Sequence, residues 1–146
     1  MNRAIWTLPL LIPTLAAGAG PSLQPGKWQE SVTIVDVQVP SAPAIATSLK
    51  GHTTRITTCL TPAQVAQGPH IALSGGTRLC RFTGFSFAGG QMRSTMVCNG
   101  RSGPTVTRSS GSYTPTSIDI IGSAATSGVM KMTMKTHTIG HRIGRC

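Results

Sequence analysis

The chain has 146 residues, a formal net charge of +10 with histidine neutral, and only three acidic residues. Its aromatic residues are two Trp, one Tyr and three Phe, which disfavours sugar-binding and base-stacking sites because such sites depend on aromatic rings. Three carboxylates also leave few groups for general acid–base catalysis. The excess of positive charge predicts affinity for polyanions.

Residues 1–19 have the composition of a secretory signal peptide. Arg3 precedes an apolar run from Ala4 to Ala17, and Ala17-Gly18-Ala19 offers the small residues that a signal peptidase reads. The run is too short to remain as a membrane-spanning helix. We expect a periplasmic or secreted protein with neither a lipid nor a transmembrane anchor. Export leaves anionic envelope lipid or polysaccharide, and not nucleic acid, as the expected partner; the oligomeric state is left open.

Residues 20–146 predict a single, mainly β domain. Turn signals such as Gly89-Gly90 recur about every ten residues, which favours an antiparallel meander forming a small barrel or strongly curved sheet. We expect Gly140 to end the last strand, before a tail that runs to Cys146. The strands expected from β-branched and aromatic content are residues 28–39, 53–60, 79–87, 91–98, 104–113, 117–121 and 129–139.

One short helix is predicted between the second and third strands. Thr61 is a suitable N-cap and Pro62 a suitable first helical residue, so a helix of about two turns follows. The stretch from Ser41 to Lys50 is expected to be a mobile connection. Trp28 begins the first strand, and we expect it to pack against the end of the barrel and not to stack on a ligand.

Four cysteines, Cys59, Cys80, Cys98 and Cys146, are predicted to form two structural disulfides, since their spacing matches neither a redox motif nor a zinc site. The favoured pairing is Cys59 with Cys80 and Cys98 with Cys146, because it would pin the short helix and the chain end. A hairpin turn centred on Gly89 instead places Cys80 opposite Cys98, which leaves Cys59 for Cys146. Four cysteines allow three pairings, and the sequence alone does not choose among them.

Met130, Met132 and Met134 alternate along the last predicted strand, so their side chains would share one face. Thioethers suit Cu(I), and a periplasmic copper-handling protein is therefore one alternative. The same alternation is typical of a flexible core face. His137 falls on the opposite face together with Lys135, so we expect the methionines to pack in the core.

No catalytic motif stands out. The segment from Gly84 to Ala88 approaches the nucleophile-elbow pattern around Ser86, but Ala88 replaces the final glycine and a hairpin follows where the elbow needs a helix. Glu30 and Asp36 would share one strand face about 20 Å apart. That separation exceeds the roughly 10 Å of a glycosidase carboxyl pair. We predict no catalytic residue and no cofactor, with an uncharacterised hydrolase as the alternative.

Four separated motifs resemble a known family. They are residues 25–29 (Pro-Gly-Lys-Trp-Gln), 59–64 (Cys-Leu-Thr-Pro-Ala-Gln), 95–98 (Thr-Met-Val-Cys) and 140–146 (Gly-His-Arg-Ile-Gly-Arg-Cys). In this order they resemble the bacterial exported domain-of-unknown-function family 3617, which is common in Gram-negative proteobacteria. The resemblance implies export, a small β-rich domain and the cysteine framework, and it carries no activity.

Two positions depart from the family pattern. Ala63 stands where the family often has an acidic residue after Thr-Pro, and Arg145 stands where it often has an acidic residue before the last cysteine. Both departures add to the basic balance of the chain. The function we expect is a non-enzymatic envelope or periplasmic binding module for an apolar or anionic envelope ligand.

Overall fold

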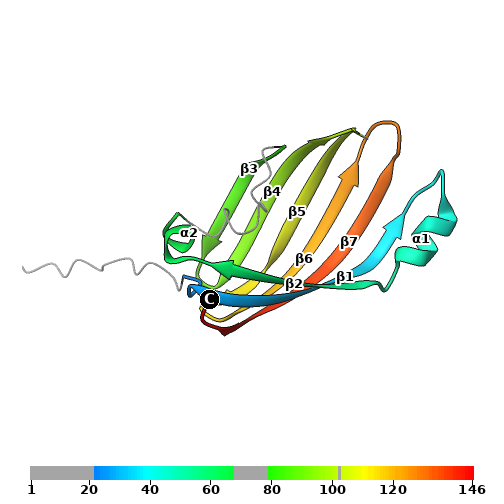
Figure 1. Cartoon of the computed structure of the whole chain (residues 1–146). Coiled ribbons are helices and arrows are strands. Elements are labelled where there is room, and N and C mark those ends of the chain that lie inside the picture. Colours follow the sequence, from blue (N-terminus) through cyan, green and yellow to red (C-terminus); the bar gives the residue numbers. More distant parts are fainter. Residues whose placement is uncertain (1–21, 68–78, 102) are drawn as a thin grey trace, which may run out of the picture.

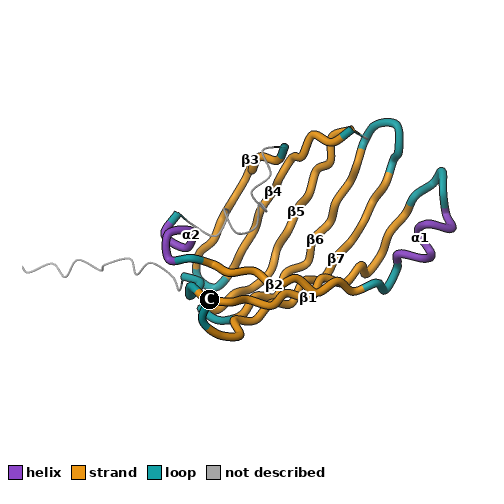
Figure 2. Tube along the Cα trace, in the orientation of Figure 1, coloured by secondary structure: helices purple, strands orange, loops and turns teal. Residues whose placement is uncertain are grey.

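The computed structural model describes residues 22–67, 79–101 and 103–146, and the predicted signal peptide lies outside these ranges. Within these ranges, seven antiparallel strands form one strongly curved sheet, and two short helices lie at opposite ends of it (Figures 1 and 2). The elements are β1 (Gly26–Gln38), α1 (Pro43–Leu49), β2 (Thr53–Leu60), α2 (Pro62–Ala66), β3 (Cys80–Ala88), β4 (Gln91–Gly100), β5 (Gly103–Thr114), β6 (Ser117–Thr126) and β7 (Met132–Gly144).

The strand order is β2-β1-β7-β6-β5-β4-β3. Strands β3 to β7 form an uninterrupted meander, and β7 then pairs with β1, which forms a hairpin with β2. Because β2 and β3 do not pair within the described residues, they are the two edges of an open sheet. The prediction of a mainly β, antiparallel and strongly curved sheet is confirmed, and the sheet stops short of a closed barrel.

The prediction that Gly140 ends the last strand is wrong. Strand β7 continues to Gly144, and Gly140 is buried within it. A Cβ added at Gly140 would lie 2.6 Å from Ile118 Cγ1 and 3.1 Å from Glu30 Cγ. The glycine therefore allows a close approach between strands β1, β7 and β6, where sequence alone indicated a break.

The prediction of α2 is confirmed by its capping chemistry. The Thr61 side chain accepts a hydrogen bond from the Gln64 backbone N–H at 3.2 Å, and the Gln64 side chain accepts one from the Thr61 N–H at 2.9 Å. This reciprocal pair satisfies two backbone donors that the helix itself leaves free.

Helix α1 corrects the prediction of a mobile connection. Its N-cap is Ala42, which offers no side-chain acceptor, so the usual sequence signal for a helix start is missing. Pro43 stands in the first turn, where its fixed backbone angle favours the helix. The helix contacts β1 and contributes no buried residue, which leaves Ile45 half exposed.

The core lies on one face of the sheet, at the end where β1 and β2 curl across strands β4 to β6 (Figure 1). Trp28 is its largest side chain and is 1% exposed, and its Nε1–H donates to the Gln24 carbonyl at 3.0 Å. We call this side the core face and the opposite side the outer face. The buried cluster on the core face is Leu23, Trp28, Leu60, Met92, Tyr113, Ile118 and Ile120.

Candidate functional site

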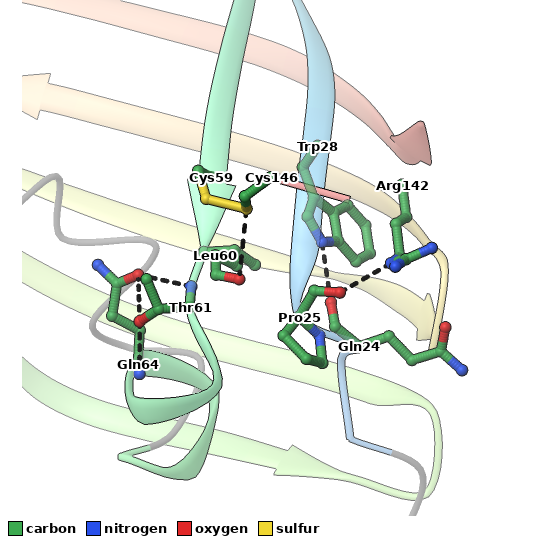
Figure 3. Close-up of a disulfide and its surroundings, with 9 residues drawn as sticks. All are labelled: Gln24, Pro25, Trp28, Cys59, Leu60, Thr61, Gln64, Arg142 and Cys146. Atoms are coloured by element: carbon green, nitrogen blue, oxygen red, sulfur yellow. Dashed lines mark hydrogen bonds between the residues drawn. A yellow bond between two sulfur atoms is a disulfide. The ribbon is translucent and has the colours of Figure 1, made fainter. Parts of the chain in front are cut away.

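Two disulfides join the four cysteines, and the favoured pairing was wrong. Cys59 bonds to Cys146 with their Cα atoms 5.7 Å apart, and Cys80 bonds to Cys98 with their Cα atoms 4.0 Å apart. Figure 3 shows the first of these beside Trp28 at the filled end of the sheet. There Arg142 Nε donates to the Pro25 carbonyl at 2.8 Å, so a disulfide and a hydrogen bond both tie the last strand to its neighbours.

The register of the β3–β4 hairpin explains the pairing. Gly89 and Gly90 both have positive φ, as the tight turn requires. The register shifts by one residue between Phe82 and Gly84, and this shift brings Cys80 directly opposite Cys98. The hairpin alternative from the sequence is therefore the correct one, and it leaves Cys59 for Cys146.

The three methionines do not share one strand face. Strand β7 begins at Met132, so Met130 lies in the preceding turn, where it is 46% exposed. Met132 and Met134 are half buried on the core face, and Met134 pairs with Val37 and Ala124 in the sheet. Among the residues that the structure describes, no group of three or more His, Cys, Asp or Glu side chains could hold a metal ion. No observation favours the copper alternative.

Ser86 lies in the middle of β3, opposite Arg93, and the strand runs on into the Gly89-Gly90 turn. A nucleophile elbow would need a strand-to-helix turn at this point. His137 Nε2 lies 2.8 Å from Asp119 Oδ1, but both side chains are open to solvent, at 39% and 62% exposure. This pair stands on the outer face in contact with solvent, and no observation favours the hydrolase alternative.

The outer face carries a groove that runs across strands β3 to β7 and has a volume of about 740 Å³. We call it the basic groove, because the side chains of Arg93, Arg108 and Lys135 line it. Arg108 pairs with Thr95 on one side and with Ser123 on the other, and Ser123 in turn pairs with Lys135. Directly paired residues point to the same face of a sheet, so these side chains form one row.

A second row lies two residues farther along each strand. Arg93 pairs with Ser110, Ser110 pairs with Ile121, and all three line the basic groove. Arg93 and Arg108 are diagonal neighbours across β4 and β5, at a separation of about 7–8 Å for such positions. Arg108 and Lys135 are two strand spacings apart, roughly 10 Å. Arg93 and Lys135 are three strand spacings apart, roughly 14 Å across the sheet, and Arg108 lies between them.

The cations of the basic groove have no carboxylate partner among the described residues. The Asp119 carboxylate contacts the His137 ring, and Asp36 Oδ1 lies 3.7 Å from Lys50 Nζ. Asp36 is the cross-strand neighbour of Lys135 and lines a smaller adjoining hollow of about 190 Å³. Glu30, the remaining acidic residue of the chain, is on the core face. The positive charge of the groove is therefore largely uncompensated.

Glu30 and Asp36 lie on opposite faces of β1, which corrects the prediction that they share one. The register of β1 against β7 shifts between Ile34 and Asp36, so that Asp36 pairs with Lys135 whereas Glu30 pairs with Gly140. Partial burial, which disfavours the charged form, raises the pKa of the Glu30 carboxyl above its ordinary value of 4.5. The folded protein therefore disfavours the ionised form of this side chain.

The variant Glu30→Gln is expected to be more stable than wild type at pH 7 and equally stable at pH 4. Below about pH 4.5 the Glu30 carboxyl is protonated in both the folded and the unfolded chain, so its burial costs least there. As the pH rises through the raised folded-state pKa, burial of the ionised carboxylate lowers the free energy of unfolding. Thermal unfolding from pH 4 to 8 measures this difference. The control Asp36→Asn, which removes a surface ion pair, should give no gain at pH 7. A gain of Glu30→Gln that is the same at every pH would contradict the assignment.

The chain is similar to one known protein family. No curated protein and no solved structure matches the chain. Within the described residues no helix is long and apolar enough to cross a membrane. Residues 23–146 match the family described as Protein of unknown function (DUF3617). The matched range contains all four motifs and both disulfides. The chain therefore belongs to the DUF3617 family.

Proposed function

We propose that the chain is an exported, non-enzymatic periplasmic binding module and that its basic groove binds an anionic ligand of the cell envelope. Export is supported by the composition of residues 1–19 and by two disulfides, which form and persist mainly in oxidising compartments. The family match carries no activity, so the choice of ligand depends on the groove.

One observation carries this proposal: three cations that have no carboxylate partner in the described part of the chain line a single hollow. Arg93, Arg108 and Lys135 line a groove of about 740 Å³, which lies within the usual size range of small-molecule sites. A cation held without a counter-charge gains most from an anion that replaces its water with charge-assisted hydrogen bonds. Hydroxyl groups of Thr95, Ser110 and Ser123 add neutral donors along the same groove.

The core face offers less support for an apolar ligand. At the Trp28 end of this face, the side chains of Trp28, Leu60 and Tyr113 already fill the space over the sheet. Phe87 stacks on Tyr113 with ring centroids 3.6 Å apart, which extends this packing toward the β3 edge. Of the two expected ligand classes, apolar and anionic, the anionic ligand is therefore favoured.

The test compares two triple variants of equal net charge. Arg93→Gln/Arg108→Gln/Lys135→Gln removes the groove cations, and Arg55→Gln/Arg101→Gln/Lys131→Gln removes three cations that do not line the groove. Each protein is expressed with its own N-terminal segment, purified from the periplasm and titrated with fluorescent dextran sulfate in about 0.1 M salt, where the screening length is roughly 10 Å.

The groove variant is expected to bind dextran sulfate at least about tenfold more weakly than wild type, and the control within about twofold, because local charge density and not total charge sets the affinity. An equal loss in both variants would show that affinity comes from overall charge, and would overturn the groove as the site. Protein found only in the cytoplasm, with its thiols reduced, would overturn export.

A further inference from the structure

We infer that the basic groove binds the phosphoryl group of a lipid headgroup, with the adjoining part of the lipid chains lying on Ile121 and Ile139. This inference rests on the proposed function and narrows its ligand to one chemical class. Three features of the outer face support it: the number of cations in the groove, their arrangement, and the exposed isoleucines beside them.

The charge of the groove suits a phosphate better than a single carboxylate. Arg108 lies about 7–8 Å from Arg93 and roughly 10 Å from Lys135, so it stands between the other two cations, which are about three strand spacings apart. A phosphomonoester carries nearly two negative charges at neutral pH and has three acceptor oxygens. Two arginines on diagonal positions can each present a planar pair of N–H donors to such a group, and a lysine adds a point charge.

The apolar surface beside the cations suits a lipid better than an acidic polysaccharide. Ile121 is 61% exposed although it lines the groove, and Ile139 is 41% exposed on the neighbouring strand. Ile121 pairs with His137, and Ile139 pairs with Asp119, so the two isoleucines are diagonal neighbours on the outer face. A polysaccharide would leave this apolar surface in water, whereas the first methylenes of a lipid chain would cover it.

The arrangement gives the ligand a direction. The phosphoryl group lies over β4 to β7 between Arg93, Arg108 and Lys135, and the chains run toward β6 and β7, where Ile121 and Ile139 lie. The His137–Asp119 pair lies between the two isoleucines, so they offer the lipid chains two separate apolar contacts. Ile121 lines the groove beside the cations, and Ile139 lies farther along the neighbouring strand.

The test uses three soluble probes and isothermal titration. Dihexanoyl phosphatidic acid, kept below its micelle-forming concentration, carries both the phosphomonoester and short chains. Glycerol 3-phosphate carries the phosphate alone, and dihexanoyl phosphatidylcholine carries the same chains with a neutralised headgroup. The proteins are wild type, Arg108→Gln, Ile121→Ser and the matched control Arg55→Gln, which lies outside the groove.

Wild type is expected to bind phosphatidic acid about tenfold or more tightly than either other probe. Arg108→Gln should weaken phosphatidic acid and glycerol 3-phosphate alike, by about tenfold or more. Ile121→Ser should weaken phosphatidic acid by roughly fivefold to tenfold and leave glycerol 3-phosphate unchanged. Arg55→Gln should match wild type with all three probes.

Four outcomes would overturn this inference in distinguishable ways. Equal binding of phosphatidic acid and phosphatidylcholine would mean an apolar site. Equal binding of phosphatidic acid and glycerol 3-phosphate would show that the lipid chains add no affinity, and the ligand would then be a free phosphate ester. If no probe binds but dextran sulfate still binds in a groove-dependent way, the phosphoryl ligand is excluded and the proposed anion-binding function stands. If no anion shows groove-dependent binding, both the phosphoryl ligand and the proposed function are excluded.

Discussion

Removal of the Cys59–Cys146 disulfide is expected to lower the free energy of unfolding by about 3–5 kcal/mol. The bond closes a sequence separation of 87 residues, and long loops lose the most entropy in the unfolded chain when they are closed. It also holds the C-terminus against the end of the edge strand β2, beside the Trp28 core (Figure 3). The double variant Cys59→Ser/Cys146→Ser should show this loss in urea denaturation followed by circular dichroism.

The matched control is Cys80→Ser/Cys98→Ser, which opens a bond with a sequence separation of 18. Its loss should be smaller by about 1 kcal/mol, because the entropy of closure rises only slowly with loop length. Peptide mapping of unreduced wild type should find the pairs Cys59–Cys146 and Cys80–Cys98. A larger loss from the short-range pair would mean that native contacts, and not loop closure, set the contribution of each bond.

The substitution Trp28→Ala is expected to destabilise the fold by about 3–5 kcal/mol, the usual cost of truncating a buried aromatic residue. The side chain is 1% exposed and belongs to the cluster that joins β1 to β4, β5 and β6. Its loss would also free the Gln24 carbonyl, which accepts the indole N–H at 3.0 Å. Thermal unfolding followed by far-ultraviolet circular dichroism measures the loss of the sheet in both proteins without using the emission of the removed tryptophan.

Trp28→Phe separates packing from hydrogen bonding at the same position. It keeps most of the ring and removes the donor, so a loss of about 1–2 kcal/mol is expected. Neither variant should change anion binding at temperatures where it remains folded, because Trp28 lies on the core face and the basic groove on the outer face. A selective loss of ligand binding in folded Trp28→Phe would contradict this separation.

Local chemistry made much of the fold predictable. Strand β2 was predicted with its observed bounds because Thr and Ile fill it, and α2 was found from the Thr61-Pro62 pair. The turn at Gly89-Gly90 was predicted because glycine tolerates the positive φ that a tight turn needs, and both residues have positive φ in the structure. These features are set by a few neighbouring residues, so one short stretch of sequence is enough to identify each of them.

Features that depend on the register between strands were less predictable. The disulfide pairing depends on a one-residue shift in β3 near Thr83, and the placement of Asp36 depends on a similar shift in β1. The role of Gly140 depends on Ile118 and Glu30 on neighbouring strands. A bulge inserts one residue and moves every later side chain to the other face, which alternation along a single strand cannot reveal.

The basic groove escaped prediction for the same reason. Lys135 was assigned to a solvent-facing strand side, but Arg93 and Arg108 belong to two other strands and meet it only through the register of four neighbouring strands. The sequence around the two arginines gives no clear alternation, since Arg93 stands between Met92 and Ser94 and Arg108 between Thr107 and Ser109. Only the strand pairing shows that these cations line one groove with Lys135.

Native mass spectrometry of the protein purified from the periplasm of its own host tests the central claim most directly. Wild type should have lost residues 1–19, carry two disulfides and retain a phosphorus-containing lipid adduct, because the groove cations have no carboxylate partner within residues 22–67, 79–101 and 103–146. The variant Arg93→Gln/Arg108→Gln/Lys135→Gln should show the same processed and oxidised chain without the adduct. The same adduct on both proteins, or none on wild type, would contradict the basic groove as the binding site.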